Sequence, residues 1–233
     1  MIMGMDGLVL LAAGPSRRFG GSTSKVLKRV AGKPMIVRAL SPFLVAVESL
    51  ALVIVARPQD HPTIKRHLPR ANLVAGGSAR VSSLLRGVAA LPEGVDVVLV
   101  HDASRPLAPA DLVRRVLAAA RRDGAAAPVV AVRDSLHHVV QATDGGPSLL
   151  EDTLDRGQLG AAQSPQAARR GLLVRALNAH KKNADGASLL PENEVALLQQ
   201  AGIPVTAVRG HPHNIRITHP EDLELAEGLL QRV

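Results

Sequence analysis

The chain has 233 residues, of which 46% are hydrophobic, so it can bury a sizeable core and is not disordered throughout. Its formal net charge of +8 suits nucleic acid or a ligand with several phosphates, but aromatic residues, at 1%, are too few for a base-stacking surface, and no long block of like charges occurs. We therefore favour a basic protein that does not bind nucleic acid, and the absence of cysteine excludes disulfides, thiolate catalysis and cysteine-based metal sites.

Six apolar runs are predicted to form strands, and in chain order they are residues 8–12, 51–56, 72–74, 95–100, 127–132 and 205–208. Several of them are almost continuously apolar, which is typical of parallel strands that are covered on both faces. The first run is too short for a membrane span or for the core of a signal peptide, and no basic segment precedes it. We therefore expect a cytoplasmic protein that has no membrane partner.

Helical spacing of apolar residues alternates with these strands at residues 34–43, 82–91 and 109–122. A capping box at residues 218–221 predicts the start of a helix near the C-terminus. The alternation predicts an α/β fold with a doubly wound, mostly parallel sheet.

One segment, residues 135–166, breaks this alternation because it is polar, with short extended pieces at residues 136–140 and near residues 159–163. We predict that it forms a protruding β-arm on a single domain that comprises residues 1–233.

The first loop after a predicted strand is the richest in small and basic residues. Ala12, Ala13 and Gly14 lead into two arginines, a Gly-Gly-Ser-Thr-Ser tract and Lys25. Ligands of doubly wound sheets bind at the carboxyl ends of the strands, where small residues allow close approach and loop N–H groups hold anionic oxygens. The loop therefore suits a nucleoside triphosphate, although it lacks the residue order of the P-loop and of dinucleotide sites. A tight turn with solvated arginines is the alternative.

Further polar motifs follow the later strands, and more occur towards the C-terminus. The motifs beyond the first loop are Gly76-Gly77 with Arg80 and Ser83, His101-Asp102-Ala103 with Arg105-Pro106, Asp134-Ser135, Asp155-Arg156, Gln163-Ser164-Pro165-Gln166, Asn214 to Thr218 and Pro220 to Leu223. In this order the motifs resemble those of the 2-C-methyl-D-erythritol 4-phosphate cytidylyltransferases, from about residue 7 to residue 230. Ala-Ala-Gly alone marks nucleotidyltransferases in general, whereas the His-Asp-Ala-x-Arg-Pro and Ser-Pro-Gln blocks are more specific but are shared with sister pentitol-phosphate cytidylyltransferases.

The resemblance implies a Rossmann-like nucleotidyltransferase that transfers CMP from CTP to 2-C-methyl-D-erythritol 4-phosphate, a polyol phosphate, and releases pyrophosphate in the synthesis of isoprenoid precursors. It also implies Mg²⁺ as the cofactor, bridging phosphate oxygens, and a homodimer formed through the arm. A pentitol-phosphate (ribitol-type) cytidylyltransferase and a catalytically weakened nucleotide-binding relative are the alternatives.

The resemblance also implies roles for particular residues. Arg18 and Lys25 correspond to the cations that stabilise the transition state, and Arg156 corresponds to an arginine that reaches the acceptor phosphate of the neighbouring subunit. No residue is expected to ligate a metal. The nucleotide is expected at Ala12, Ala13, Gly14, Gly77 and Ser83, and the acceptor at Asp102, Ala103, Arg105, Arg156, Ser164 and Arg216, the last of which replaces the usual lysine.

Several of these residues also have simpler interpretations. Asp102 could support Mg²⁺ from the outer shell, Arg105 could pair with a carboxylate, and residues 164–166 could be a structural turn. We expect His101 to be a packed residue at the end of a strand rather than a base, because the attacking phosphate is already ionised near neutral pH. The pair His137-His138 is expected on the arm surface, because no third ligand stands at metal spacing.

The sequence departs from the family pattern at two positions, one beside Lys25 and one in the segment expected to hold the acceptor. Ser24 stands where the family usually has proline before the lysine, which makes the loop less pre-organised. Glu192-Asn193-Glu194 stands where the family has Thr-Asp-Glu or Thr-Asp-Asp, if no gap is allowed before Gly202 and Asn214. A gapped alignment would instead use residues 184–188. We favour the ungapped alignment and expect Glu192 to weaken acceptor binding by charge repulsion.

Overall fold

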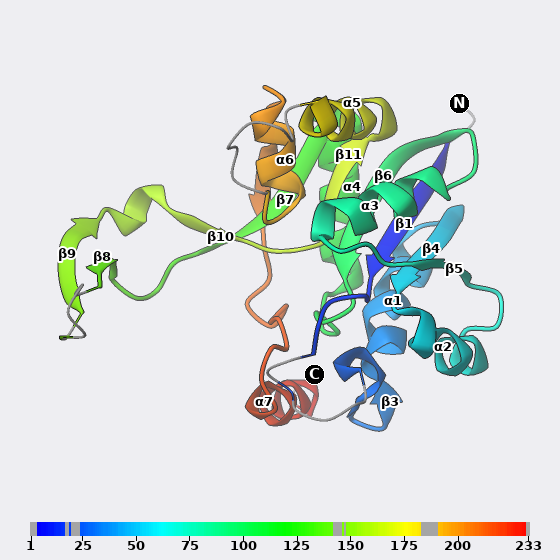
Figure 1. Cartoon of the computed structure of the whole chain (residues 1–233), viewed down its shortest axis with the longest axis horizontal. Coiled ribbons are helices and arrows are strands. Elements are labelled where there is room, and N and C mark those ends of the chain that lie inside the picture. The colour runs from blue at the N-terminus through cyan, green and yellow to red at the C-terminus, as the bar shows by residue number, and fades with distance from the viewer. Residues whose placement is uncertain are drawn as a thin grey trace.

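The computed structural model describes residues 4–16, 19, 24–141, 146, 148–182 and 191–231. Its centre is an eight-stranded sheet with the strand order β10-β7-β11-β6-β1-β4-β5, and β12 pairs with β7 as well (Figure 1). The strands of this sheet are β1 (Met5–Leu11), β4 (Leu50–Ala56), β5 (Asn72–Ala75), β6 (Val95–Asp102), β7 (Ala125–Ala131), β10 (Gly160–Ala162), β11 (Gln166–Arg169) and β12 (Thr206–Arg209).

Most neighbouring strands of this sheet run parallel, as predicted. Strand β1 is parallel to β4 and β6, β4 is parallel to β5, and β12 is parallel to β7, whereas β10 and β11 are antiparallel to their neighbours. All six predicted strands are present, so the doubly wound α/β prediction is confirmed. Strand β11 was not predicted, and it lies between β6 and β7.

Helices cover both faces of the sheet. They are α1 (Met35–Ala46), α2 (His61–His67), α3 (Arg80–Ala89), α4 (Ala110–Asp123), α5 (Arg170–Lys182), α6 (Glu194–Gln200) and α7 (Glu221–Leu230), together with short 3₁₀ turns at Lys25–Leu27, Pro58–Asp60 and Arg156–Gln158. The three helical predictions correspond to α1, α3 and α4. Among the described residues, no helix is long and apolar enough to cross a membrane.

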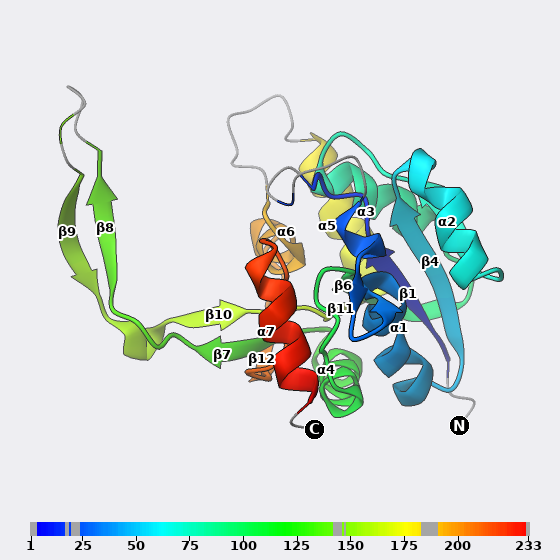
Figure 2. The same cartoon turned by 90° about the horizontal axis from the view of Figure 1, so that it is seen from below.

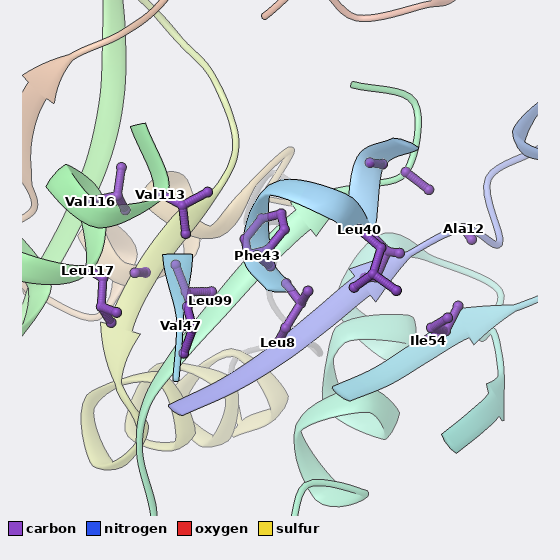
Figure 3. Close-up of a cluster of buried hydrophobic side chains, with 14 of the residues drawn as sticks. Leu8, Ala12, Leu40, Phe43, Val47, Ile54, Leu99, Val113, Val116 and Leu117 are labelled. Carbon is purple, nitrogen blue, oxygen red and sulfur yellow. The ribbon is translucent and has the colours of Figure 1, made fainter. Parts of the chain in front are cut away.

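The core has two layers because side chains alternate between the faces of each strand. On one face, Leu8 and Leu10 of β1 pack in a cluster with Phe43 of α1 and with residues of α4, and Figure 3 shows part of this cluster. On the other face, Val9 packs in a cluster with residues of α3, α5 and α6, including Leu84. Strand β1 is therefore covered on both sides, and a ligand can approach it only at its ends.

The arm is a hairpin of β8 (Leu136–Val140) and β9 (Leu149–Leu154), which stands away from the body of the molecule (Figures 1 and 2). It is shorter than the predicted segment 135–166, because β10 belongs to the main sheet, where it pairs with β7. Gly160 allows this pairing: a Cβ atom there would lie 2.2 Å from Cγ1 of Val129.

Helix α7 begins with a cap that differs from the predicted capping box. The carboxylate that reaches back is that of Asp222 rather than Glu221, and its Oδ2 accepts hydrogen bonds from the backbone N–H groups of Thr218 (2.7 Å) and His219 (2.9 Å). Ala226 of this helix packs in a small cluster with Val30, Met35 and Ile217. This packing holds residues 216–218 in place at the edge of the cavity described next.

Candidate functional site

A cavity of about 530 Å³ lies at the carboxyl ends of β1 and β6. It is the place that the doubly wound topology predicts for a ligand. Its walls come from five stretches of the chain that are far apart in sequence. The lining residues are Leu11, Ala12, Ala13, Gly14, Pro15, Ser16, Lys25, Val26, Gly77, Ser78, Ala79, Arg80, Ser83, Asp102, Ser104, Glu192, Arg216 and Thr218.

Two loops form the wall that was predicted to bind a nucleotide. The loop after β1 contributes Ala13 and Gly14, and the loop after β5 contributes Gly77, whose N–H donates a hydrogen bond to Oγ of Ser83 (2.9 Å). The loops approach each other closely, since a Cβ atom on Gly76 would lie 2.3 Å from Cβ of Ala13. The contact therefore requires glycine at this position, and it presents backbone groups from both loops to the cavity.

Lys25 contributes a positive charge to the same cavity. Its backbone N–H donates to Oγ of Ser16 (3.0 Å), and its Nζ donates to the carbonyl oxygen of Ile217 (2.9 Å). The preceding Ser24 is buried, and its hydroxyl makes no hydrogen bond among the described residues. Its φ of −59° is one that proline adopts, so the local backbone matches the family residue. The other predicted catalytic cation, Arg18, lies outside the described residues.

Arg80, which also lines the cavity, connects two carboxylates. Its Nη1 donates to Oδ1 of Asp102 (2.7 Å), while its Nε and Nη2 donate to Oε1 and Oε2 of Glu194 (3.2 and 3.0 Å). On the other side of Asp102, Nε of Arg216 lies 3.9 Å from Oδ2. Neither Arg80 nor Glu194 was assigned a role from the sequence, although Arg80 is part of the Gly76-Gly77 motif.

The charges around Asp102 and Glu194 shift their pKa values in opposite directions. Burial by itself raises the pKa of Asp102, but Arg80 and Arg216 together outweigh it and lower this pKa to about 2. Burial raises the pKa of Glu194, and the attraction to Arg80 only partly offsets the increase. The two-oxygen contact with the Arg80 fork is nevertheless the geometry of an ionised carboxylate.

His101 and Ser164 lie behind Asp102. Nε2 of the His101 ring is 3.1 Å from the carbonyl oxygen of Arg105, which can only accept, so this nitrogen carries the proton. Nδ1 then accepts from the Ser164 hydroxyl (2.9 Å), and Oγ of Ser164 accepts from the backbone N–H of Asp102 (3.1 Å). His101 is therefore a buried, neutral residue at the end of its strand, as predicted.

The structure brings together most of the predicted site residues that it describes. Ala12, Ala13, Gly14, Lys25, Gly77, Ser83, Asp102 and Arg216 all line the cavity. Four predicted acceptor residues do not. Ala103 and Ser164 are buried beneath the wall, Arg105 donates to the carbonyl oxygen of Asn214 (2.7 Å), and Arg156 is exposed on the segment that follows the arm hairpin.

Two of these residues have partners within the chain, and their acceptor roles stay predictions. The hydroxyl of Ser164 is occupied by His101 and the Asp102 backbone, so it supports Asp102 instead of contacting the cavity. Arg105 donates to a backbone carbonyl group rather than to the carboxylate considered for it, and it too lies outside the cavity lining.

The segment with the altered family pattern also reaches the cavity. Glu192 is exposed and lines the cavity, and Glu194 pairs with Arg80. This placement agrees with the ungapped alignment, whereas residues 184–188 of the gapped alternative lie outside the described residues. In the sequence, the unchanged spacing to Gly202 and Asn214 was the signal that placed Glu192 and Glu194 in this segment.

The donor set fits Mg²⁺ only as a companion of a phosphate ligand. Within the described part of the chain, no three His, Cys, Asp or Glu side chains gather to hold a metal ion. The outer-shell role considered for Asp102 stays a prediction, because Arg80 engages only its Oδ1. Mg²⁺ commonly takes phosphate oxygens and water molecules as ligands, so it would be held through the phosphates of the bound ligand, whose remaining charge Lys25 would balance.

A cavity at the carboxyl ends of parallel strands, lined by two loops of small residues and by basic side chains, defines a nucleotide-binding α/β protein. Its size suits a ligand larger than a single phosphate. The chain belongs to the 2-C-methyl-D-erythritol 4-phosphate cytidylyltransferase family, whose model matches residues 7–232.

Similar proteins agree with this assignment. The chain is 36% identical over 236 residues to a 2-C-methyl-D-erythritol 4-phosphate cytidylyltransferase of Streptomyces avermitilis, covering 96% of this chain and 91% of that protein. The crystal structure of the enzyme of that name from Thermus thermophilus superimposes with a TM-score of 0.77 at 30% identity, covering 97% of this chain and all of the other. A structure from Anaerococcus prevotii with a TM-score of 0.80 and 24% identity supports the fold.

Other relatives are longer. The chain is 38% identical over 232 residues to the bifunctional enzyme IspD/IspF of Desulfotalea psychrophila, and it spans 96% of its own length but 56% of that protein. It therefore spans about half the length of the bifunctional relatives that it matches.

Burial of His101 predicts a pH dependence of stability. Burial lowers the pKa of His101 to about 4, whereas an unfolded chain binds this proton below about pH 6.5. Between these values only the unfolded chain is protonated, so the free energy of unfolding decreases as the pH falls. From pH 7 to pH 5 we expect His101 to account for a loss of about 2 kcal/mol.

Urea unfolding of the wild type and of His101→Asn at both pH values measures this contribution. The variant should lose about 2 kcal/mol less than the wild type over the same interval. Equal pH dependence in the wild type and in His101→Asn would show that His101 binds its proton as readily in the folded protein as in the unfolded chain, which would contradict the prediction.

Proposed function

We propose that this chain transfers CMP from CTP to 2-C-methyl-D-erythritol 4-phosphate and releases pyrophosphate. The observation that carries the proposal is that the two loops of small residues, Lys25, Asp102 and Arg216 all line the same cavity. Membership of the cytidylyltransferase family and the names of the relatives support the same reaction. A cytoplasmic location stays a prediction.

The reaction joins two anions, so the residues of the chain mainly reduce repulsion and align the reacting groups. An oxygen of the acceptor phosphate attacks the α-phosphorus of CTP, the bond from this phosphorus to the bridging oxygen breaks, and pyrophosphate leaves with the electron pair. The acceptor phosphate is already ionised near neutral pH, so no protein nucleophile or base is required.

Each wall of the cavity has a part in this alignment. The backbone groups near Gly14 and Gly77 hold the nucleotide, and Lys25, with Arg18, stabilises the charge that develops on the phosphates. The Asp102 carboxylate accepts hydrogen bonds from hydroxyl groups of the polyol phosphate, and Arg216 attracts the phosphate of that substrate. Bound Mg²⁺ would neutralise further charge on the phosphate oxygens.

A homodimer accounts for the exposed arm and for Arg156. Large apolar side chains of β8 and β9 are exposed, among them Val139, Leu149 and Leu150. A two-stranded hairpin has little stability by itself, so a second copy of the chain is a suitable cover. In such a dimer Arg156, which does not line its own cavity, would serve the acceptor site of the partner.

The reaction is tested by pyrophosphate release with each of the four nucleoside triphosphates and a panel of polyol phosphates that includes pentitol phosphates. We expect CTP with Mg²⁺ to be the preferred donor and methylerythritol phosphate the preferred acceptor. Preference for a purine triphosphate would contradict the donor assignment, and preference for a pentitol phosphate would favour the alternative acceptor. No release with any pair would indicate a nucleotide-binding relative without activity.

The division of labour between two subunits is tested by complementation. Lys25→Ala should lower kcat/KM by roughly 100-fold, about 3 kcal/mol, because a stabilising charge is lost next to the phosphates. Arg156→Ala should also reduce activity. A mixture of the two variants should recover part of the activity, because hybrid dimers contain one site with both residues.

The neighbouring exposed lysine supplies the control, since Lys28→Ala should retain wild-type activity. Activity of Lys25→Ala within a few-fold of the wild type would refute its role. A fully active monomer at micromolar concentration would refute the dimer.

Glu192 supplies a specific test of acceptor identity. A carboxylate on the cavity wall repels an incoming phosphate, by about 1 kcal/mol at roughly 4 Å in a water-like dielectric. Glu192→Thr should therefore lower the KM for methylerythritol phosphate several-fold and leave the KM for CTP nearly unchanged. Glu192→Gln removes only the charge and should reproduce most of the effect. An unchanged acceptor KM in both variants would show that Glu192 points away from the acceptor.

A further inference from the structure

The guanidinium group of Arg80 joins three elements of the fold at one point. Arg80 is the first residue of α3, Glu194 is the first residue of α6, and Asp102 is the last residue of β6. Two N–H groups of Arg80 point to the two oxygens of Glu194, and a third points to Oδ1 of Asp102. Arg80 and Asp102 line the cavity, whereas Glu194 does not.

The arrangement depends on the planar fork of arginine. Glu194 occupies one side of the fork with two hydrogen bonds and thereby fixes the plane of the guanidinium group. Nη1 is then directed at Oδ1 of Asp102. A lysine ammonium has no such plane and could not hold the two carboxylates in a fixed relative orientation.

Asp102 is held from behind as well, because its backbone N–H donates to Ser164. With Oδ1 engaged by Arg80, the carboxylate has one oxygen left, Oδ2, on the side of the cavity-lining Arg216. Glu194 itself is 3% exposed and cannot contact a ligand in the cavity. Its effect on a ligand must therefore pass through Arg80 and Asp102.

We propose that Arg80 and Glu194 are positioning residues, which hold the Asp102 carboxylate with Oδ1 engaged and Oδ2 directed at a hydroxyl group of the polyol phosphate. This inference rests on the proposed function, and it adds the means by which the chain orients its acceptor. It assigns Arg80 to Asp102 rather than to a substrate phosphate, because two carboxylates already balance its charge.

The same contacts determine the charge of Asp102. Arg80 from α3, Arg216 from the loop after β12 and Arg105 interact with this carboxylate, and the neutral His101 and the carboxylate of Glu194 lie beside it. Without Arg80, two buried carboxylates would share the site without their bridging cation, and the pKa of Asp102 would rise because burial and the charge of Glu194 both oppose ionisation. An acceptor hydroxyl would then lose its ionised partner at mildly acidic pH.

The experiment compares the wild type with Arg80→Met, Arg80→Lys and Glu194→Gln in the pyrophosphate assay between pH 5.5 and pH 8. We expect Arg80→Met and Glu194→Gln to lower kcat/KM for the acceptor by about tenfold or more at pH 8, as a misdirected binding group does. The KM for CTP should change by less than about threefold. Arg80→Lys should recover part of the loss, because the cation returns without the fork.

The pH dependence separates positioning from a structural role. The ratio of Arg80→Met to wild-type activity towards the acceptor should fall further as the pH decreases, and the titration of the substrate phosphate cancels in this ratio. Asp6→Asn is the control, because it breaks the ion pair of another buried carboxylate, Asp6 with Arg121 at 2.7 Å, at the end of β1 away from the cavity. The ratio of Asp6→Asn activity to wild-type activity should stay constant over the same pH range.

A direct titration by NMR of the Asp102 carboxyl carbon tests the contact without substrate. In the wild type this carbon should not titrate above pH 4, and in Arg80→Met it should. The proposal is overturned if Arg80→Met leaves this titration unchanged, or if the variants impair CTP and acceptor equally with a constant pH ratio. Failure of the wild type to release pyrophosphate would refute the proposed function alone, because the NMR result still decides whether Arg80 controls Asp102.

Discussion

The site depends on the register between β1 and β6. Strand β1 is hydrogen-bonded to parallel neighbours on both edges and covered by helices on both faces, so its position in the molecule is fixed. In this register Leu11 is the partner of Asp102. The loop that begins at Ala12 and the carboxylate at the end of β6 are therefore neighbours. A shift by one residue would turn Asp102 to the other face of the sheet and separate the two halves of the cavity.

Asp102 is constrained from two directions, and each direction has a distinct physical cause. Behind it, the neutral imidazole of His101 and the hydroxyl of Ser164 form a chain in which each of these groups both donates and accepts, so the buried polar atoms are satisfied. On its Oδ1 side, Arg80 supplies the charge that keeps the buried carboxylate ionised, and Glu194 holds the plane of Arg80. A carboxylate with so little freedom can discriminate among hydroxyl positions of an acceptor, because misplacement of a ligand group is not relieved by rotation of the side chain.

The amino-acid sequence by itself determined the elements that are repeated and regular. The six apolar runs became strands of the central sheet because continuous apolar segments are stable only where both faces are covered. The loops of small and basic residues came to lie at one edge because parallel strands end on the same side. Thus the fold class, the location of the cavity and much of its lining, including Gly14, Gly77 and Lys25, could be predicted.

The tertiary structure decided which segments meet. Strand β11 inserts antiparallel between β6 and β7. It could not be predicted, because Gln166–Arg169 is too short to show a periodic pattern. Strand β10 joins the sheet through close packing at Gly160. Arg80 and Glu194 are 114 residues apart, and each, taken alone, has the sequence signal of an ordinary charged residue at the start of a helix. Local periodicity reports which residues are buried, but the partner of a buried charge is fixed only by the packing of distant elements.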